Sequence, residues 1–183
     1  MLAWSRRQFR HGLILLLLAA MPTAQLSASP AVSEYAVKAA LLLKLSRFVY
    51  LPDDNAEHEP HLCILGQNPF GDELERLNQA SDRPYQVSLT PSANAAQASA
   101  CDFVFVSRSE RRRLAPILKQ LADYPLVTIS DIQGFARNGG MVELALTSRR
   151  DNQISILINR QAASQQQIEF NAQLLRLAVL INE

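Results

Sequence analysis

The chain has 183 residues, and 48% of them are hydrophobic, which predicts one domain with a sizeable core. Its formal net charge is +1 at pH 7. The first 29 residues contain three arginines and no acidic residue, so the remainder carries a net charge of about −2. This balance excludes a general nucleic-acid-binding protein, which needs a strong excess of Lys and Arg.

The amino-terminal segment is typical of an export signal. Arg6, Arg7 and Arg10 form a charged region, and the apolar run over residues 13–20 is too short to span a bilayer permanently. We expect residues 1–29 to be cleaved, although cleavage within 29–31 also fits. The paired arginines leave Sec and twin-arginine export open. Both routes predict a periplasmic protein, residues 30–183, that does not span the membrane after cleavage.

The first half of the mature chain alternates helices with short apolar strands. Residues 33–49 favour a helix because they contain no Gly or Pro. Residues 61–66 predict a strand, and Asn68-Pro69 predicts the start of a helix that ends near Gln79. Residues 84–90 predict a second strand.

The second half continues the pattern and then changes. Residues 103–106 and 126–129 predict buried parallel strands on either side of a helix that Ser107-x-x-Glu110 would cap. Residues 141–147 and 153–159 predict a hairpin. A long helix is expected over 162–181.

These elements predict an α/β fold with a mostly parallel sheet flanked by helices. Numbering the strands along the chain, we expect the order 2-1-3-4, followed by an antiparallel hairpin at the edge.

Two cysteines remain in the mature chain, Cys63 and Cys101. Each lies near the start of a predicted strand, and these two strands are neighbours in the expected order. In an exported protein this arrangement predicts a disulfide. Two separate buried thiols are the alternative.

The motifs of common enzymes and cofactor sites are absent from the sequence, including G-x-G-x-x-G, the P-loop and G-x-S-x-G. Outside the leader the histidines are His58 and His61, in an acid-rich connection before the first strand. A metal could bind there, but a solvated loop is the expectation. We therefore expect no catalytic residue, no metal and no cofactor.

The loop after the strand at 126–129 is the candidate ligand site, because open α/β sheets bind ligands beyond the carboxyl ends of their strands. Ser130 and Asp131 lie there. The hypothesis is a pocket between this loop and the regions of Arg47 and Arg160. The plainer interpretation is that Ser130 caps a short turn.

The first helix is the candidate partner surface. Leu41 and Leu45 fall on the same face as charged residues such as Lys38, and Lys44 adjoins them. A helix that is apolar nearly all round is either buried or paired. We expect the face with Leu41 and Leu45 to be covered by the chain's own carboxy-terminal helix, by another protein or by a second copy in a homodimer.

An arginine cluster and a glycine pair complete the notable features. Arg108 and Arg111–Arg113 crowd the start of a helix, where the dipole disfavours cations, and are either solvated or face an acidic or phosphate-bearing partner. Gly139-Gly140 is best explained by positive φ angles.

Five separated segments carry a resemblance to a known family: VTISDIQGFARNGGMVEL (127–144), AVKAALLLKLSRFVYLP (36–52), CILGQNPFGDELERL (63–77), ISILINRQAA (154–163) and LLRLAVLI (174–181). Together they resemble the YfiR-like family of periplasmic regulators. The resemblance covers residues 33–182. It implies a non-catalytic repressor that holds the periplasmic domain of an inner-membrane diguanylate cyclase, restraining cyclic-di-GMP signalling and biofilm formation. A periplasmic small-molecule binding or sensor protein is the alternative function.

Overall fold

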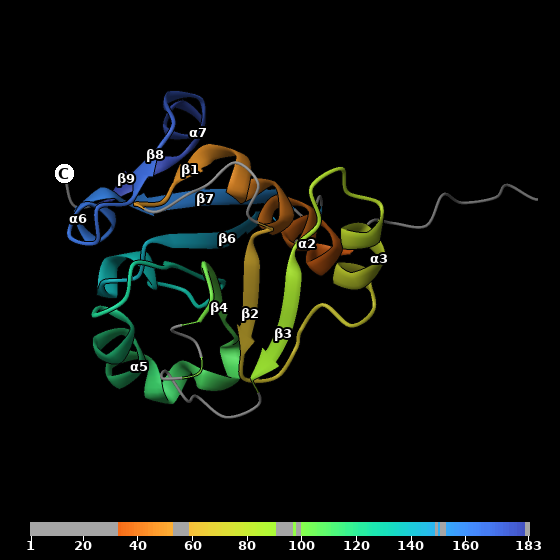
Figure 1. Ribbon diagram of the computed structural model, residues 1–183, viewed down its shortest axis with the longest axis horizontal. Helices are drawn as coiled ribbons and strands as arrows, with labels where there is room; N and C mark the ends of the chain where they lie inside the picture. Colours follow the sequence, from red (N-terminus) through yellow and green to blue (C-terminus); the bar gives the residue numbers. More distant parts are fainter. Residues whose placement is uncertain are drawn as a thin grey trace, which may run out of the picture. The chain divides into compact units, whose positions relative to one another are not determined.

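A seven-stranded, mostly parallel sheet organises the part of the chain that the computed structural model describes, namely residues 33–52, 59–90, 97, 100–148, 150 and 153–181 (Figure 1). All of these residues belong to the unit Val32–Glu183. The expected leader, residues 1–29, lies outside them, and its cleavage stays a prediction. None of the described helices is long and apolar enough to cross a membrane.

The strands follow the order β3-β2-β4-β5-β6-β7-β9, which confirms the predicted order 2-1-3-4 and the hairpin beside it. Neighbouring strands are parallel except for the antiparallel hairpin β6–β7. The bounds are β2 (His61–Leu65), β3 (Gln86–Thr90), β4 (Phe103–Val106), β5 (Val127–Ser130), β6 (Val142–Ser148), β7 (Gln153–Asn159) and β9 (Val179–Ile181).

Side-chain alternation along the central strands creates two cores, one on each face of the sheet. In β4, Phe103 and Phe105 pack into the core under α2 (Glu34–Lys44) and α3 (Glu73–Gln79). Val104 and Val106 pack into the core under α5 (Leu114–Leu121). All four residues are buried, as expected for a parallel strand covered on both faces. Figure 1 shows α3 and α5 on opposite sides of these strands.

The helix starts differ in part from the sequence prediction. Ser33 caps α2 by accepting a hydrogen bond from the backbone N of Ala36 at 3.1 Å. The chain continues from α2 into η1 (Leu45–Phe48) and the short strand β1 (Val49–Tyr50). The predicted helix start at Asn68-Pro69 is wrong, because α3 begins only at Glu73. The Asn68 side chain instead accepts from the backbone N of Phe70, which forms a turn.

The prediction of one long helix over residues 162–181 is wrong. The segment contains α6 (Arg160–Ser164), β8 (Glu169–Phe170), α7 (Ala172–Leu177) and β9. Gln167 has a φ of 58°, which a continuing right-handed helix does not allow. β8 pairs with β1 in a second, two-stranded sheet, and β9 pairs with β7. The hairpin is therefore covered by β9 and is not the edge of the sheet.

Candidate functional site

A buried ion pair joins α2 to the carboxyl end of β5. The Lys38 Nζ lies 2.7 Å from Oδ2 of Asp131, and both side chains are 0% exposed. Asp131 directly follows β5, as the sequence predicted, and Lys38 reaches it from the first helix. Because charges without water need close partners, this pair fixes α2 to the loop at the strand end.

Two further groups contact the same carboxylate oxygen. The Tyr35 hydroxyl donates to Oδ2 of Asp131 at 3.0 Å, and the Arg108 Nε lies 3.0 Å from it. Burial, followed by the negative charge and hydrogen bond of Asp131, raises the pKa of Tyr35 to about 12. The Arg108 guanidinium is half exposed, and its carbon lies 5.9 Å from the centre of the Tyr35 ring.

Glu34 connects the two cations of this group. Its carboxylate pairs with Lys38 and, at 3.2 Å, with the guanidinium of Arg108. Partial burial by itself would raise the pKa of Glu34, but the hydrogen bond and charge of Lys38, together with Arg108, lower it below its ordinary value. Glu34, Lys38, Arg108, Tyr35 and Asp131 therefore form one charged network, which we call the Asp131 network.

The other carboxylate oxygen of Asp131 is left without a donor. Oδ1 is buried and has no hydrogen-bond partner among the described residues. Ser130 does not compensate for it, because its hydroxyl donates to the carbonyl of Val106 at 2.6 Å and accepts from the N of Ile132. Ser130 thus organises the turn, as its plainer interpretation held.

The loop after Asp131 is held by a buried acid from β6. The Glu143 carboxylate accepts hydrogen bonds from the backbone N of Gly134 at 3.0 Å and of Ala136 at 3.1 Å. Gly139 has a φ of 101°, as predicted, whereas the positive φ predicted for Gly140 is wrong. Gly140 is needed for a different reason, since a Cβ there would lie 2.1 Å from the ring of Phe135.

A cleft of about 1090 Å³ opens beside the Asp131 network. Its polar walls include Asp131, Glu34 and three arginines, and its apolar walls come from the loop and the hairpin. The lining residues are Glu34, Arg108, Arg111, Asp131, Ile132, Gln133, Gly134, Arg137, Glu143, Ala145, Leu146 and Leu157.

The pocket hypothesised from the sequence is not assembled as proposed. Arg47 pairs with Asp82, and Arg160 lines a separate cavity of about 590 Å³. Neither arginine lines the cleft beside Asp131, and Ser130 is buried beneath it. Of the four residues in the hypothesised pocket, Asp131 alone lines this cleft. The arginine beside it is Arg108, from the cluster noted in the sequence, and not Arg47 or Arg160.

The partner surface hypothesised on the first helix also needs correction. Leu45 is 2% exposed and lies in the core, and Leu41 packs partly against that core. Lys38 points inward to Asp131, whereas Lys44 is exposed. A partner can therefore reach Lys44 and part of Leu41, but not Leu45 or Lys38, because the domain itself covers them.

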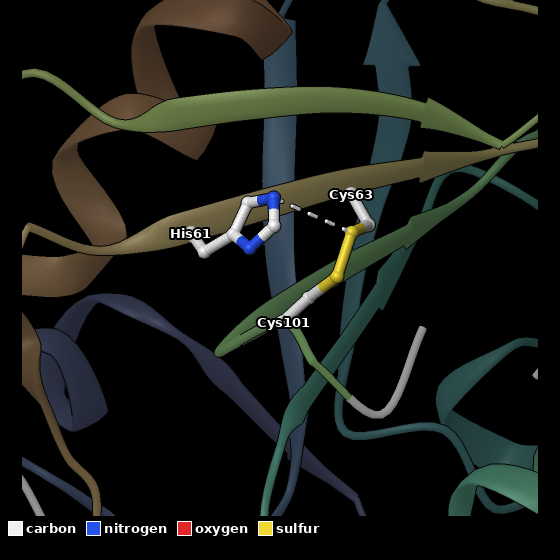
Figure 2. Close-up of side chains that lie close together, drawn as sticks. All are labelled: His61, Cys63 and Cys101. Atoms are coloured by element: carbon white, nitrogen blue, oxygen red, sulfur yellow. Dashed lines mark hydrogen bonds between the residues drawn. A yellow bond between two sulfur atoms is a disulfide. The ribbon is translucent and has the colours of Figure 1, made fainter. Parts of the chain in front are cut away.

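Cys63 and Cys101 form a disulfide, as predicted, and His61 lies beside it (Figure 2). The His61 Nε2 is 3.9 Å from Sγ of Cys63 and 2.8 Å from the Ser88 hydroxyl, while Nδ1 is 3.1 Å from the carbonyl of Ala100. His61 is the first residue of β2, as the strand predicted over residues 61–66 implies, and it is half buried, so it does not lie in the solvated loop that was expected to hold both histidines. His58 lies outside the described residues. The side-chain atoms of His61, Cys63 and Cys101 that could bind a metal lie within 4.8 Å of one another. The two sulfurs are bonded to each other, however, so they are not available as thiolate ligands.

Sequence reasoning missed Glu34, Tyr35, Arg137 and Glu143 as parts of this region. Glu143 carried a signal, because a carboxylate inside an otherwise apolar strand needs a buried partner. The sequence could place Glu34 beside Lys38 on one helix, but it gave no signal for the contact of Glu34 with Arg108 or of Tyr35 with Asp131, because these partners lie 74 and 96 residues away along the chain.

Solved structures with similar folds are distant in sequence, and nine chains match at a significant level. A conserved domain protein from Vibrio cholerae O1 biovar El Tor has a TM-score of 0.55 and 10% identity. An ABC domain from Streptococcus pneumonia, in complex with L-Trp, has a TM-score of 0.54 and 11% identity. Each match covers 81% of this chain and 60% of the other, and at this identity it shows the fold alone.

No curated protein matches the chain at a significant level. A match to a known family covers residues 35–179, which is most of the chain and includes both cysteines, all of α2 except Glu34, and the Asp131 loop. The chain therefore belongs to the YfiR/HmsC-like family.

Proposed function

We propose that the chain is a non-catalytic periplasmic regulator that binds and represses the periplasmic domain of an inner-membrane diguanylate cyclase. It would thereby restrain cyclic-di-GMP signalling and biofilm formation. The observation that carries the proposal is membership of the YfiR/HmsC-like family over residues 35–179. The disulfide between Cys63 and Cys101 supports an oxidising compartment.

The exposed carboxy-terminal end of α2 is the proposed contact. Lys44 is exposed there, next to the partly buried Leu41. The Asp131 network holds this helix in place through Lys38, so its exposed side is a fixed surface. A rigid helix face of this kind suits recognition of a folded partner domain.

A membrane pull-down tests the proposal. The tagged, oxidised protein should recover an inner-membrane protein with a cyclase domain from detergent-solubilised membranes. Deleting the gene should raise cellular cyclic-di-GMP, and the wild-type copy should lower it again. Recovery of no cyclase, together with unchanged cyclic-di-GMP on deletion, would overturn the proposed function.

A charge reversal tests whether α2 is the contact surface, independently of whether the protein binds a cyclase. Lys44→Glu should weaken recovery of the cyclase, because reversing the charge removes the complementarity between this lysine and the partner surface. Such a change slows association and alters its salt dependence. Lys119→Glu on α5 is the matched control, since Lys119 is also an exposed helical lysine but lies on another element. Equal recovery with both variants would move the contact away from α2 without affecting the proposed function.

A further inference from the structure

Two arginines of the cleft have no ion-pair partner among the described residues. Arg111 follows Arg108 in η2 (Arg108–Arg113), and Arg137 lies in η3 (Ala136–Asn138) after the Asp131 loop. Both line the cleft of about 1090 Å³. They come from separate segments of the chain, so the fold brings them to one cleft.

The acidic groups of the cleft are already compensated from other directions. Glu34 and Oδ2 of Asp131 pair with Lys38 and Arg108, and Glu143 accepts from two backbone amides. Among the described residues, none of these acidic groups forms an ion pair with Arg111 or Arg137. The positive charge of these two arginines therefore remains available to an anion.

Asp131 supplies an independent observation that points to a ligand. Its side chain is 0% exposed and lines the cleft, yet no described residue donates to Oδ1, while Oδ2 has three neighbours that can donate to it. Buried carboxylate oxygens almost always have a partner. Of the two cations that pair with Asp131, Lys38 is fully buried and Arg108 is half exposed, so a ligand would approach Asp131 from the side of Arg108.

We propose that this cleft binds a small molecule that carries a carboxylate or phosphate for Arg111 and Arg137 and a hydroxyl or amino group that donates to Oδ1 of Asp131. The side chains of Leu146 and Leu157 line the same cleft and suit the hydrocarbon part of such a molecule. This site goes beyond the proposed repression of a cyclase and does not depend on it, because its test needs only the purified protein.

Isothermal titration calorimetry with three matched dicarboxylates tests whether a group on the ligand donates a hydrogen bond to Oδ1 of Asp131. Succinate, malate and aspartate carry hydrogen, hydroxyl and ammonium at one carbon and are otherwise alike. Malate or aspartate should bind at least about tenfold more tightly than succinate, as expected for one hydrogen bond to a charged group. Glycerol 3-phosphate tests whether phosphate replaces the carboxylate. Binding by none of the four, or succinate binding as tightly as malate and aspartate, overturns the proposal.

Variants of the two arginines locate the site. Arg111→Gln and Arg137→Gln should each weaken the best ligand by about tenfold or more. Both arginines are exposed and form no ion pair with another described residue, so the fold should survive these changes. Arg112→Gln is the matched control, because Arg112 is an exposed neighbour in η2 that does not line the cleft. Affinity unchanged in Arg111→Gln and Arg137→Gln, or lowered equally in Arg112→Gln, overturns the proposal.

Discussion

Lys38 has its whole side chain inside the domain, although it lies on a helix whose sequence suggested an exposed charged face. An ammonium group tolerates the loss of water only where anions replace it. Glu34 and Asp131 do so, one from the same helix and one from 93 residues further along the chain. The helical wheel could place Lys38 beside Glu34, but the long-range partner that turns this face inward is a property of the fold.

Breaking the buried pair should strongly destabilise the protein. Lys38→Met leaves Asp131 buried without its closest cation, which should lower the free energy of unfolding by about 3–5 kcal/mol. Urea denaturation measures the change. Lys44→Met is the matched control on the same helix, where an exposed lysine should contribute no more than about 0.5 kcal/mol.

A double variant distinguishes the ion pair from packing. Lys38→Met with Asp131→Leu removes both charges, and its cost should be smaller than the sum of the two single changes. Additive costs would mean that the two side chains do not act as a pair.

Tyr35 should ionise late in an alkaline titration. Its folded pKa of about 12 exceeds that of an unfolded tyrosine, about 10. The protein therefore keeps this contribution to stability below about pH 10 and loses it as the pH rises towards 12. Near-ultraviolet absorbance should show a late tyrosinate phase that Tyr35→Phe reduces. Tyr50→Phe, at an exposed site, should leave that phase intact.

Gly140 should not tolerate a side chain. A Cβ at this position would overlap the ring of Phe135, which is fully buried and cannot move away. Gly140→Ala should therefore lower stability by about 1–3 kcal/mol in urea denaturation. Adding Phe135→Leu makes room, so the double variant should cost less than the sum of its parts; a strictly additive result would contradict the steric explanation.

At the scale of elements, the central strands were predictable and the carboxy-terminal segment was not. Runs such as Phe103–Val106 are too short and too apolar to be anything but buried strands, and their order follows from right-handed crossovers. In the last segment, the apolar residues Ile168, Leu175 and Val179 fit a helical period. Asn171 was the missed signal, because it caps a new helix by accepting from the N of Gln173 and Leu174. The pairings of β8 and β9 depend on partners far away in sequence.

The disulfide links two neighbouring elements near their starts. Cys63 lies in β2, and Cys101 is separated from the start of β4 by Asp102, with a sequence separation of 38 between the cysteines. Cys63→Ser with Cys101→Ser should lower the free energy of unfolding by about 4 kcal/mol. The reason is that, without the cross-link, the denatured chain regains the conformational entropy that closing a loop of this length had removed.

Peptide mapping without reductant checks the link directly. It should recover Cys63 and Cys101 in one linked peptide pair, and a reductant should lower the melting temperature of the wild type but not of the double serine variant. Alkylation of both cysteines in the native, oxidised protein would show that the bond does not form.

At the scale of the whole molecule, the sequence placed Asp131 at the carboxyl ends of the parallel strands but did not predict the cleft beside it. Asp131 was expected there because strand ends gather at one edge. Arg108 and Arg111 were visible as members of one cluster, but nothing in the sequence indicated that Arg108 pairs with Glu34 and Asp131 while Arg111 forms no ion pair with a described residue. The cleft depends on how η2, η3 and the hairpin approach one another, and no local pattern encodes those distances.

The position of β9 also sets the order in which the sheet can be completed. Leu157 of β7 pairs with Val179, so the hairpin has an open edge until residues 179–181 have been synthesised. The part of β7 that would stay unpaired includes the apolar residues Leu157 and Ile158. An open, apolar edge is a template for pairing with another chain. A chain stopped before Val179 should therefore aggregate, and a carboxy-terminal fusion needs a spacer beyond Ile181, which is itself buried.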